Sequence, residues 1–245
     1  MLKTIARTAT VLALASLFAL PGFASKKSKT PDVNVVDSGT FGIFKAGKRV
    51  ATETFKIEQS GGSSVTRSEI KAEDGTAEMS QNSELQLAAN GDIVKYDWHE
   101  TKPEKKDSTL SVGDQVLTQR VGATEKEKPR EIPYILPAST SVLDDYFFVH
   151  RELITWKYIA SECPDLSKCQ LPKGSVGVII PRQHVSGVVS LEYKGLDNTE
   201  LHGSQTALNH FILHADEADW SLYLDAKHKL VKVEVPSEQI EAIRD

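Results

Sequence analysis

Apolar residues at every second position constrain the fold of this chain more than any other feature of its sequence. The cleanest example is the alternation of Val185, Gly187, Val189, Leu191 and Tyr193. The same period of two recurs over residues 94–98 and 220–224. This period is typical of a β-strand that buries one face and exposes the other. The sequence therefore predicts a protein built mainly from antiparallel strands.

Turn-forming dipeptides separate the alternating runs. Asn90-Gly91 is a strong signal for a two-residue hairpin turn, and Gly61-Gly62 and Asp74-Gly75 mark further turns. The runs between such signals number about eleven strands. We expect residues 35–245 to form one domain, a large curved antiparallel sheet or half-barrel. Pro236 is expected to end the last strand, before a short terminal helix at 238–244.

One longer helix is predicted in the middle of the chain. Ser141-Val-Leu-Asp144 has the form of a helix N-terminus, and the apolar residues after it recur with helical spacing. We therefore expect an amphipathic helix at about 140–160 that covers the concave, apolar face of the sheet. The space between helix and sheet is either a filled core or a lined pocket, and this choice decides the function.

The first 24 residues have the form of a cleaved signal peptide. Lys3 and Arg7 precede an apolar run at 11–20, and Gly22-Phe23-Ala24 offers small residues to a signal peptidase. The alternative is a membrane anchor, but the apolar run is shorter than the roughly 20 residues that a span requires. We expect cleavage after Ala24, a disordered lysine-rich leader at 25–34, and a periplasmic protein.

The charge balance after cleavage argues against some partners. Loss of Lys3 and Arg7 leaves 27 of the 29 basic residues against 34 acidic residues, a net charge of −7. Nucleic acids and anionic lipid surfaces bind clustered positive charge. Neither is therefore expected as a main partner, and no later segment is predicted to span a membrane.

The two cysteines lie close together in the sequence. Cys163 and Cys169 are separated by five residues that include Pro164 and Asp165. In an oxidising compartment such a pair predicts a disulfide that closes a surface loop. A redox pair or half of a metal site are the alternatives. The missing Cys-x-x-Cys spacing and the lack of further ligands nearby favour the disulfide.

Several short segments carry a resemblance to other proteins. They are Leu143-Asp-Asp145, Phe148-Val-His150-Arg-Glu-Leu153, Val178-Ile-Ile-Pro-Arg-Gln183, Trp220-Ser-Leu-Tyr-Leu-Asp225 and Leu230-Val-Lys-Val-Glu-Val-Pro236. Their order resembles that in a group of secreted bacterial proteins of unknown function. The layout of that group is similar to that of the periplasmic lipoprotein carriers LolA and LolB, half-barrels closed by helices. The resemblance implies a half-barrel and a role with a hydrophobic ligand, although those carriers use several helices where this sequence predicts one.

The first functional prediction is a non-catalytic periplasmic protein without a cofactor. It would bind a lipid or the acyl chain of a lipoprotein between the helix and the sheet. The residues expected to line its pocket are Leu143, Tyr146, Phe147, His150 and Ile154. If aromatic side chains fill this space instead, the alternative is an envelope protein-interaction module with a closed core.

A histidine-dependent hydrolase or metalloenzyme is the third hypothesis. His150 lies on the apolar helix face, with Asp144 and Asp145 near enough in sequence to orient it as a general base. More often such a histidine is a core residue with one hydrogen bond. His210 and His214 share a face, but a zinc site needs a third ligand. No Gly-x-Ser-x-Gly nucleophile motif or glycine-rich phosphate loop is present, so no catalytic or metal residue is assigned.

Overall fold

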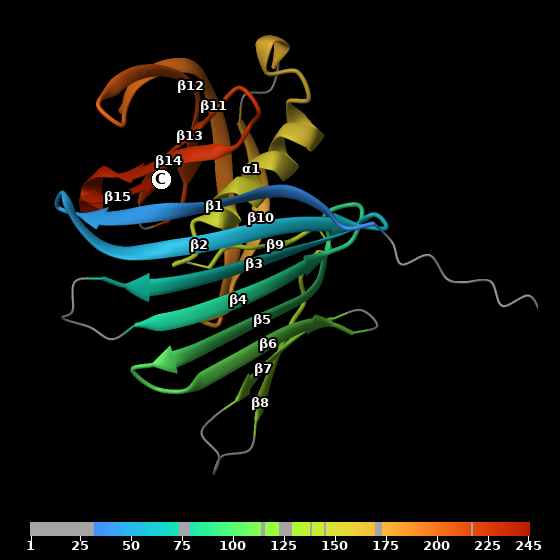
Figure 1. The fold of residues 1–245 in the computed structure, drawn as a ribbon. Coiled ribbons are helices and arrows are strands. Elements are labelled where there is room, and N and C mark those ends of the chain that lie inside the picture. The colour runs from blue at the N-terminus through green and yellow to red at the C-terminus, as the bar shows by residue number, and fades with distance from the viewer. Residues whose placement is uncertain are drawn as a thin grey trace, which may run out of the picture. The chain divides into compact units, whose positions relative to one another are not determined.

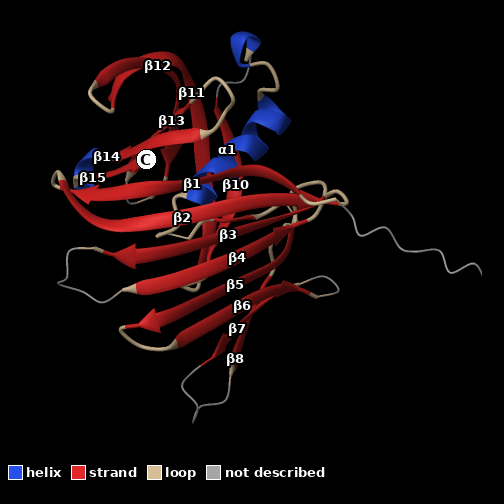
Figure 2. Ribbon diagram, in the orientation of Figure 1, coloured by secondary structure: helices blue, strands red, loops and turns tan. Residues whose placement is uncertain are grey.

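The computed structural model describes residues 32–73, 79–113, 116–122, 129–137, 139–144, 146–169, 173–216 and 218–245. The predicted signal peptide (1–24), residues 25–31 of the predicted leader, the turn at Asp74-Gly75 and Asp145 lie outside these ranges. Strands dominate the described fold (Figure 2). The prediction of a mainly β protein is therefore confirmed.

Fifteen strands and one α-helix make up the described part of the chain. The first eight strands are β1 (Asn34–Lys45), β2 (Lys48–Ser60), β3 (Ser63–Ala72), β4 (Ser80–Leu87), β5 (Ile93–Lys102), β6 (Lys106–Val112), β7 (Leu117–Gly122) and β8 (Arg130–Tyr134). After them come β9 (Ser141–Val142), α1 (Val149–Glu162) and a short 3-10 helix (Leu166–Lys168). The last elements are β10 (Lys173–Ile180), β11 (Val185–Leu201), β12 (Ser204–His214), β13 (Asp219–Leu224), β14 (Leu230–Val235), a second 3-10 helix (Pro236–Glu238) and β15 (Ile240–Arg244).

All fifteen strands belong to one open, curved sheet. Its order is β8-β7-β6-β5-β4-β3-β2-β1-β15-β14-β13-β12-β11-β10-β9. Two meanders therefore meet where β1 pairs with β15, and Figure 1 shows them on either side of this pair. Neighbouring strands are antiparallel except β9, which pairs in parallel with β10. The curved antiparallel sheet is as predicted, with fifteen strands in place of about eleven.

The strands alternate between buried and exposed side chains, as the period of two predicts. In β2, Ala51, Glu53, Phe55 and Ile57 are buried, and Thr54 and Lys56 between them are exposed. The inner face carries an apolar set and a polar set of buried residues. The apolar set includes Ile57, Leu85, Tyr96 and Leu110, and the polar set includes Glu53, Ser68, Gln81, Ser108 and Gln119. The inner face of the sheet is therefore only partly hydrophobic.

The predicted start of the helix is wrong. The helix begins at Val149, not near residue 140, because Ser141 and Val142 form β9 and pair with Val178 and Ile179 of β10. A contact with a distant strand thus overrides the local helix-start pattern.

Two further boundaries differ from the predictions. Residues 240–244 form strand β15, not a helix, because they pair with β1 on one side and β14 on the other. β1 already begins at Asn34, the last residue of the predicted leader.

Candidate functional site

A cleft of about 660 Å³ lies between α1 and the inner face of β1–β4. Ile57, Leu85 and Leu87 line it from the sheet. Leu153, Ile154 and Trp156 line it from the helix. Pockets for small molecules typically measure about 300–1,000 Å³ and have mostly apolar walls. The cleft thus has the size and the apolar walls of a ligand site.

Polar residues surround the opening of this cleft. Gln59, Asn90, Ser139, Ser161 and Ser175 are exposed lining residues. An apolar interior with a polar rim allows an amphiphilic molecule to bury its chain and keep its polar end in contact with water.

Two charged residues stand among the described lining of the cleft, Lys157 and Glu162. The Lys157 Nζ donates hydrogen bonds to the carbonyl oxygens of Ser139, at 2.8 Å, and Gly91, at 3.2 Å. Burial lowers the pKa of Lys157, although Asp92 acts in the opposite direction. Lys157 therefore joins the β4–β5 turn to the segment before β9 at one end of the cleft.

The five residues expected to line a pocket lie in different places. Ile154 lines the cleft. Leu143, Phe147 and His150 are buried in the core beside it and are not among its lining residues. Tyr146 is 46% exposed, and its ring covers the Arg182 guanidinium at 3.7 Å. The structure therefore brings one of the five to the cleft.

A buried polar cluster surrounds Asp144, at the chain segment between β9 and α1. Its carboxylate accepts hydrogen bonds from the Tyr96 hydroxyl at 2.8 Å and the Arg182 Nε at 2.6 Å. Burial raises the pKa of Asp144, and the Arg182 charge opposes that rise. The cluster ties the segment before α1 to β5 and to the turn after β10.

His150 belongs to the same cluster as a core residue. Its Nδ1 accepts a hydrogen bond from the Asp144 backbone N–H at 3.2 Å, so the carboxylate of Asp144 does not orient it. The ring is fully buried against Tyr96 and Phe147. Burial lowers its pKa to about 3, helped by the charges of Arg151 and Arg182. The imidazole is therefore neutral and has no exposed surface.

Glu53 of β2 caps the N-terminus of α1. Its Oε2 accepts a hydrogen bond from the Phe148 N–H at 2.7 Å, and its Oε1 accepts from the Val149 N–H at 3.3 Å and the Ser68 hydroxyl at 2.7 Å. These backbone groups have no partner within a helix, and a carboxylate also interacts favourably with the helix dipole there. Burial nevertheless raises the pKa of Glu53 to about 7.

A second set of buried ionisable groups lies at the first turn of α1. Arg244 of β15 donates two hydrogen bonds to the Asp37 carboxylate, at 2.7 and 2.8 Å, and Lys229 donates one at 2.6 Å. Burial alone would raise the pKa of Asp37, but these partners hold it at about 2. Burial and the neighbouring Asp37 raise the pKa of Glu152 on α1 well above its ordinary range. Of these two buried carboxyl groups, Glu152 therefore holds a proton more strongly than Asp37.

The two histidines of β12 have separate acidic neighbours. His210 lies 3.5 Å from Asp197, whereas His214 contacts Asp219 at 2.8 Å and Glu192 at 3.1 Å. Within the described residues, no group of three or more His, Cys, Asp or Glu side chains is placed to hold a metal ion. These histidines therefore do not lead to a metal assignment.

Cys163 and Cys169 form a disulfide, with their Cα atoms 5.0 Å apart. Cys163 is the C-cap residue of α1 and is buried. The bond thus ties the end of the helix to the loop that leads to β10, as the sequence predicted.

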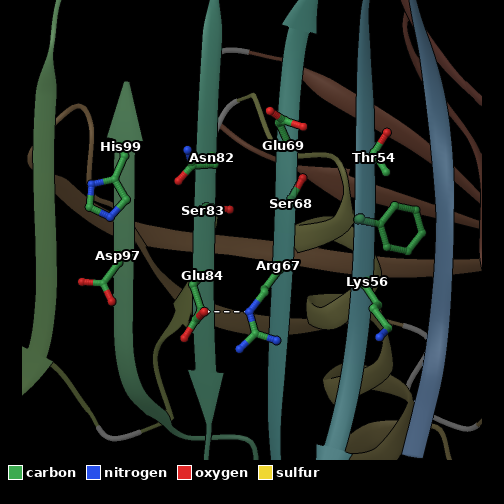
Figure 3. Close-up of a pocket in the computed structure, with 11 residues that line it drawn as sticks. Thr54, Lys56, Arg67, Ser68, Glu69, Asn82, Ser83, Glu84, Asp97 and His99 are labelled. Atoms are coloured by element: carbon green, nitrogen blue, oxygen red, sulfur yellow. Dashed lines mark hydrogen bonds and ion pairs between the residues drawn. The ribbon is translucent and has the colours of Figure 1, made fainter. Parts of the chain in front are cut away.

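The outer face of the sheet carries a separate polar hollow of about 520 Å³ (Figure 3). Exposed residues of β2–β5 line it, among them Thr54, Lys56, Asn82 and His99. Arg67 pairs with Glu84, shown dashed in Figure 3, and with Glu58, both at 2.8 Å. Because its prominent cation is already neutralised by two carboxylates, this hollow is a weaker ligand candidate than the cleft.

Comparisons with protein-family models, curated proteins and solved structures give no match to this chain. No described helix is long and apolar enough to cross a membrane.

Sequence reasoning missed Lys157 and the sheet wall of the cleft. Lysine on a helix is most often solvated, so its position alone carried no signal. Leu85 and Leu87 alternate with polar residues in the sequence, which indicates a strand. Nothing local distinguishes a strand residue that lines a cleft from one that fills a core.

Proposed function

We propose that this chain is a non-catalytic periplasmic binding protein that holds the apolar chain of a lipid or lipoprotein between α1 and the sheet. The observation that carries the proposal is the cleft of about 660 Å³ with apolar walls from both elements. A methylene group occupies about as much space as a water molecule in liquid water, roughly 30 Å³. The cleft volume therefore corresponds to about twenty such groups, enough for one acyl chain.

Two features support export to the periplasm as part of this proposal. Residues 1–24 have the composition of a signal peptide, and the disulfide at the end of α1 is of a kind that persists in oxidising compartments. The apolar side chains that line the cleft from both α1 and the sheet support binding as its role.

The test is ligand binding by the purified protein and by a variant whose cleft is filled. Ala160 lines the cleft and is exposed, so Ala160→Trp should obstruct it without disturbing the core. Ala207→Trp places the same side chain at an exposed position of β12 and is the matched control. We expect dodecanol or laurate to bind the wild type and Ala207→Trp, measured by native mass spectrometry, and to bind Ala160→Trp at least tenfold more weakly.

Absence of any adduct with the wild-type protein would refute the proposal, as would equal binding by Ala160→Trp. The search would then turn to protein partners of the sheet surface.

A further inference from the structure

The ammonium group of Lys157 in the cleft has no ion-pair partner among the residues that the structure describes. The Lys157 Nζ has two acceptors, the carbonyl oxygens of Ser139 and Gly91, and both are neutral. Among the described residues, no carboxylate lies within ion-pair distance of it, and Asp92 acts only from further away. Other partly buried cations of the fold do have such partners, for example Lys229 on Asp37 and Lys232 on Glu234.

Lys157 is also placed where a bound molecule would meet it. Its side chain lines the cleft, and its stem lies along Gly91, where an added Cβ would be 3.9 Å from the lysine Cδ and Cε. Leu153 and Ile154 lie one turn earlier on the same helix and line the apolar part. Glu162, the other charged lining residue, is exposed and lies at the β10 side, near Gly174.

We propose that the cleft selects a single-chain amphiphile with an anionic headgroup, a carboxylate or a phosphate, which pairs with Lys157 while its chain lies against Leu85, Leu87 and Ile154. This inference rests on the proposed function, because it names the ligand class of the same cleft. An ammonium has three donors, and two are used by the carbonyl groups, so one remains for an incoming anion. A hydrogen bond between two charged groups is stronger than one between neutral groups.

The lowered pKa of Lys157 agrees with this assignment. An ammonium that is partly removed from water without an opposite charge is destabilised. A bound anion would remove that cost, so the anion gains more from Lys157 than a neutral headgroup does. The volume of the cleft argues for one chain, since it accommodates about twenty methylene-sized groups of roughly 30 Å³ each.

The experiment compares headgroups on one chain by isothermal titration calorimetry. Laurate and dodecyl phosphate are the two anionic probes, dodecanol is the neutral probe and dodecyltrimethylammonium the cationic one. The proteins are the wild type, Lys157→Met, Lys157→Arg and Lys168→Met. Lys168 lies outside the cleft with an 81% exposed side chain and is the matched control.

We expect the anionic probes to bind the wild type more tightly than dodecanol. Lys157→Met should weaken the binding of the better anionic probe by about tenfold to a hundredfold, which is the range expected for the loss of a hydrogen bond to a charged group. Its binding of dodecanol should weaken by less, so that the anionic probe loses its advantage over dodecanol, and measurable dodecanol binding also shows that the variant is folded. Lys157→Arg should retain the preference for anions, and Lys168→Met should match the wild type. Whichever anion binds more tightly identifies the source as a fatty acid or a phosphorylated lipid.

The failures of the two proposals are distinguishable. If all four probes bind the wild type equally and Lys157→Met changes nothing, the headgroup assignment is wrong and the binding function stands. If no probe binds the wild type, both are wrong.

Discussion

Replacing Glu53 with glutamine should change how the free energy of unfolding depends on pH. Glutamine keeps an oxygen that accepts from the Phe148 N–H at the start of α1, and it has the same shape. The ability to titrate is lost, and so is the oxygen that accepts from the Val149 N–H and the Ser68 hydroxyl. The loss of that acceptor costs stability at every pH, so the pH dependence still reports the titration alone. The buried carboxyl of Glu53 has a pKa of about 7 in the folded protein, against 4.5 for an ordinary glutamate.

The sign follows from the number of protons bound. Between about pH 4.5 and pH 7 the folded protein keeps the proton on Glu53 and the unfolded chain has lost it. Stability from this group is therefore fully present below pH 4.5 and is lost as the pH rises through 7. The displacement of about 2.5 pKa units corresponds to about 3 kcal/mol, at roughly 1.4 kcal/mol per unit. Relative to Glu53→Gln, the wild type should lose about 3 kcal/mol over this range.

Urea unfolding, followed by tryptophan fluorescence at several pH values and constant ionic strength, measures this difference. Other titrating groups contribute equally to the pH dependence of unfolding in both proteins, so their effects cancel in the comparison. Glu69→Gln on β3 is the control, because Glu69 is exposed and pairs only with Lys71 among the described residues. Curves for Glu53→Gln and wild type that run parallel from pH 4.5 to 7 would show that Glu53 is not a desolvated cap, and the account of the helix start would be wrong.

Two further changes test other buried features. His150→Asn should behave in the opposite sense, because the folded-state pKa of His150 is about 3 and its ordinary value 6.5. The contribution of the neutral imidazole to the free energy of unfolding is fully present above pH 6.5 and is lost as the pH falls towards 3. Its full size is about 5 kcal/mol, and more than half of the loss should appear between pH 7 and 4.5 in the same unfolding assay. A difference between the two proteins that does not change with pH would contradict this. The double change of Cys163 and Cys169 to alanine should cost about 2–2.5 kcal/mol, from the loop that the disulfide closes. A reductant should lower the free energy of unfolding of the wild type by a similar amount and leave that of the double variant unchanged. If the reductant lowers both, the disulfide is not the cause.

The strands were predictable because their signal is local. Residues 185–193 form part of strand β11, and Asn90-Gly91 lies in the turn between β4 and β5. Of the alternating set, however, only Val189 and Leu191 are buried, while Val185 and Gly187 are exposed. β15 was missed because residues 238–244 have no strong local strand signal. Pairing with β1 and β14 makes it a strand, and tertiary context commonly overrides weak intrinsic preferences in this way.

The helix start failed for a similar reason. Ser141 and Asp144 match a capping pattern, yet the cap of α1 comes from Glu53, 95 residues before Phe148. The residues near position 141 in the sequence give no sign that Glu53 caps the helix. The lysine of the cleft was equally hidden, since its role depends on the carbonyl groups of Gly91 and Ser139, which belong to other segments.

The late start of the helix and the existence of the cleft are connected. Residues 139–142 are not helical; Ser141 and Val142 pair with β10, and Ser139 supplies a carbonyl group to Lys157. The same residues line the cleft opposite α1. A helix that began at residue 140 would have removed this extended wall and the acceptor that positions Lys157. The pairing of β9 with β10, which the sequence did not predict, therefore also shapes the opening of the cleft. For this reason, only one of the five residues expected to line a pocket, Ile154, lines the cleft.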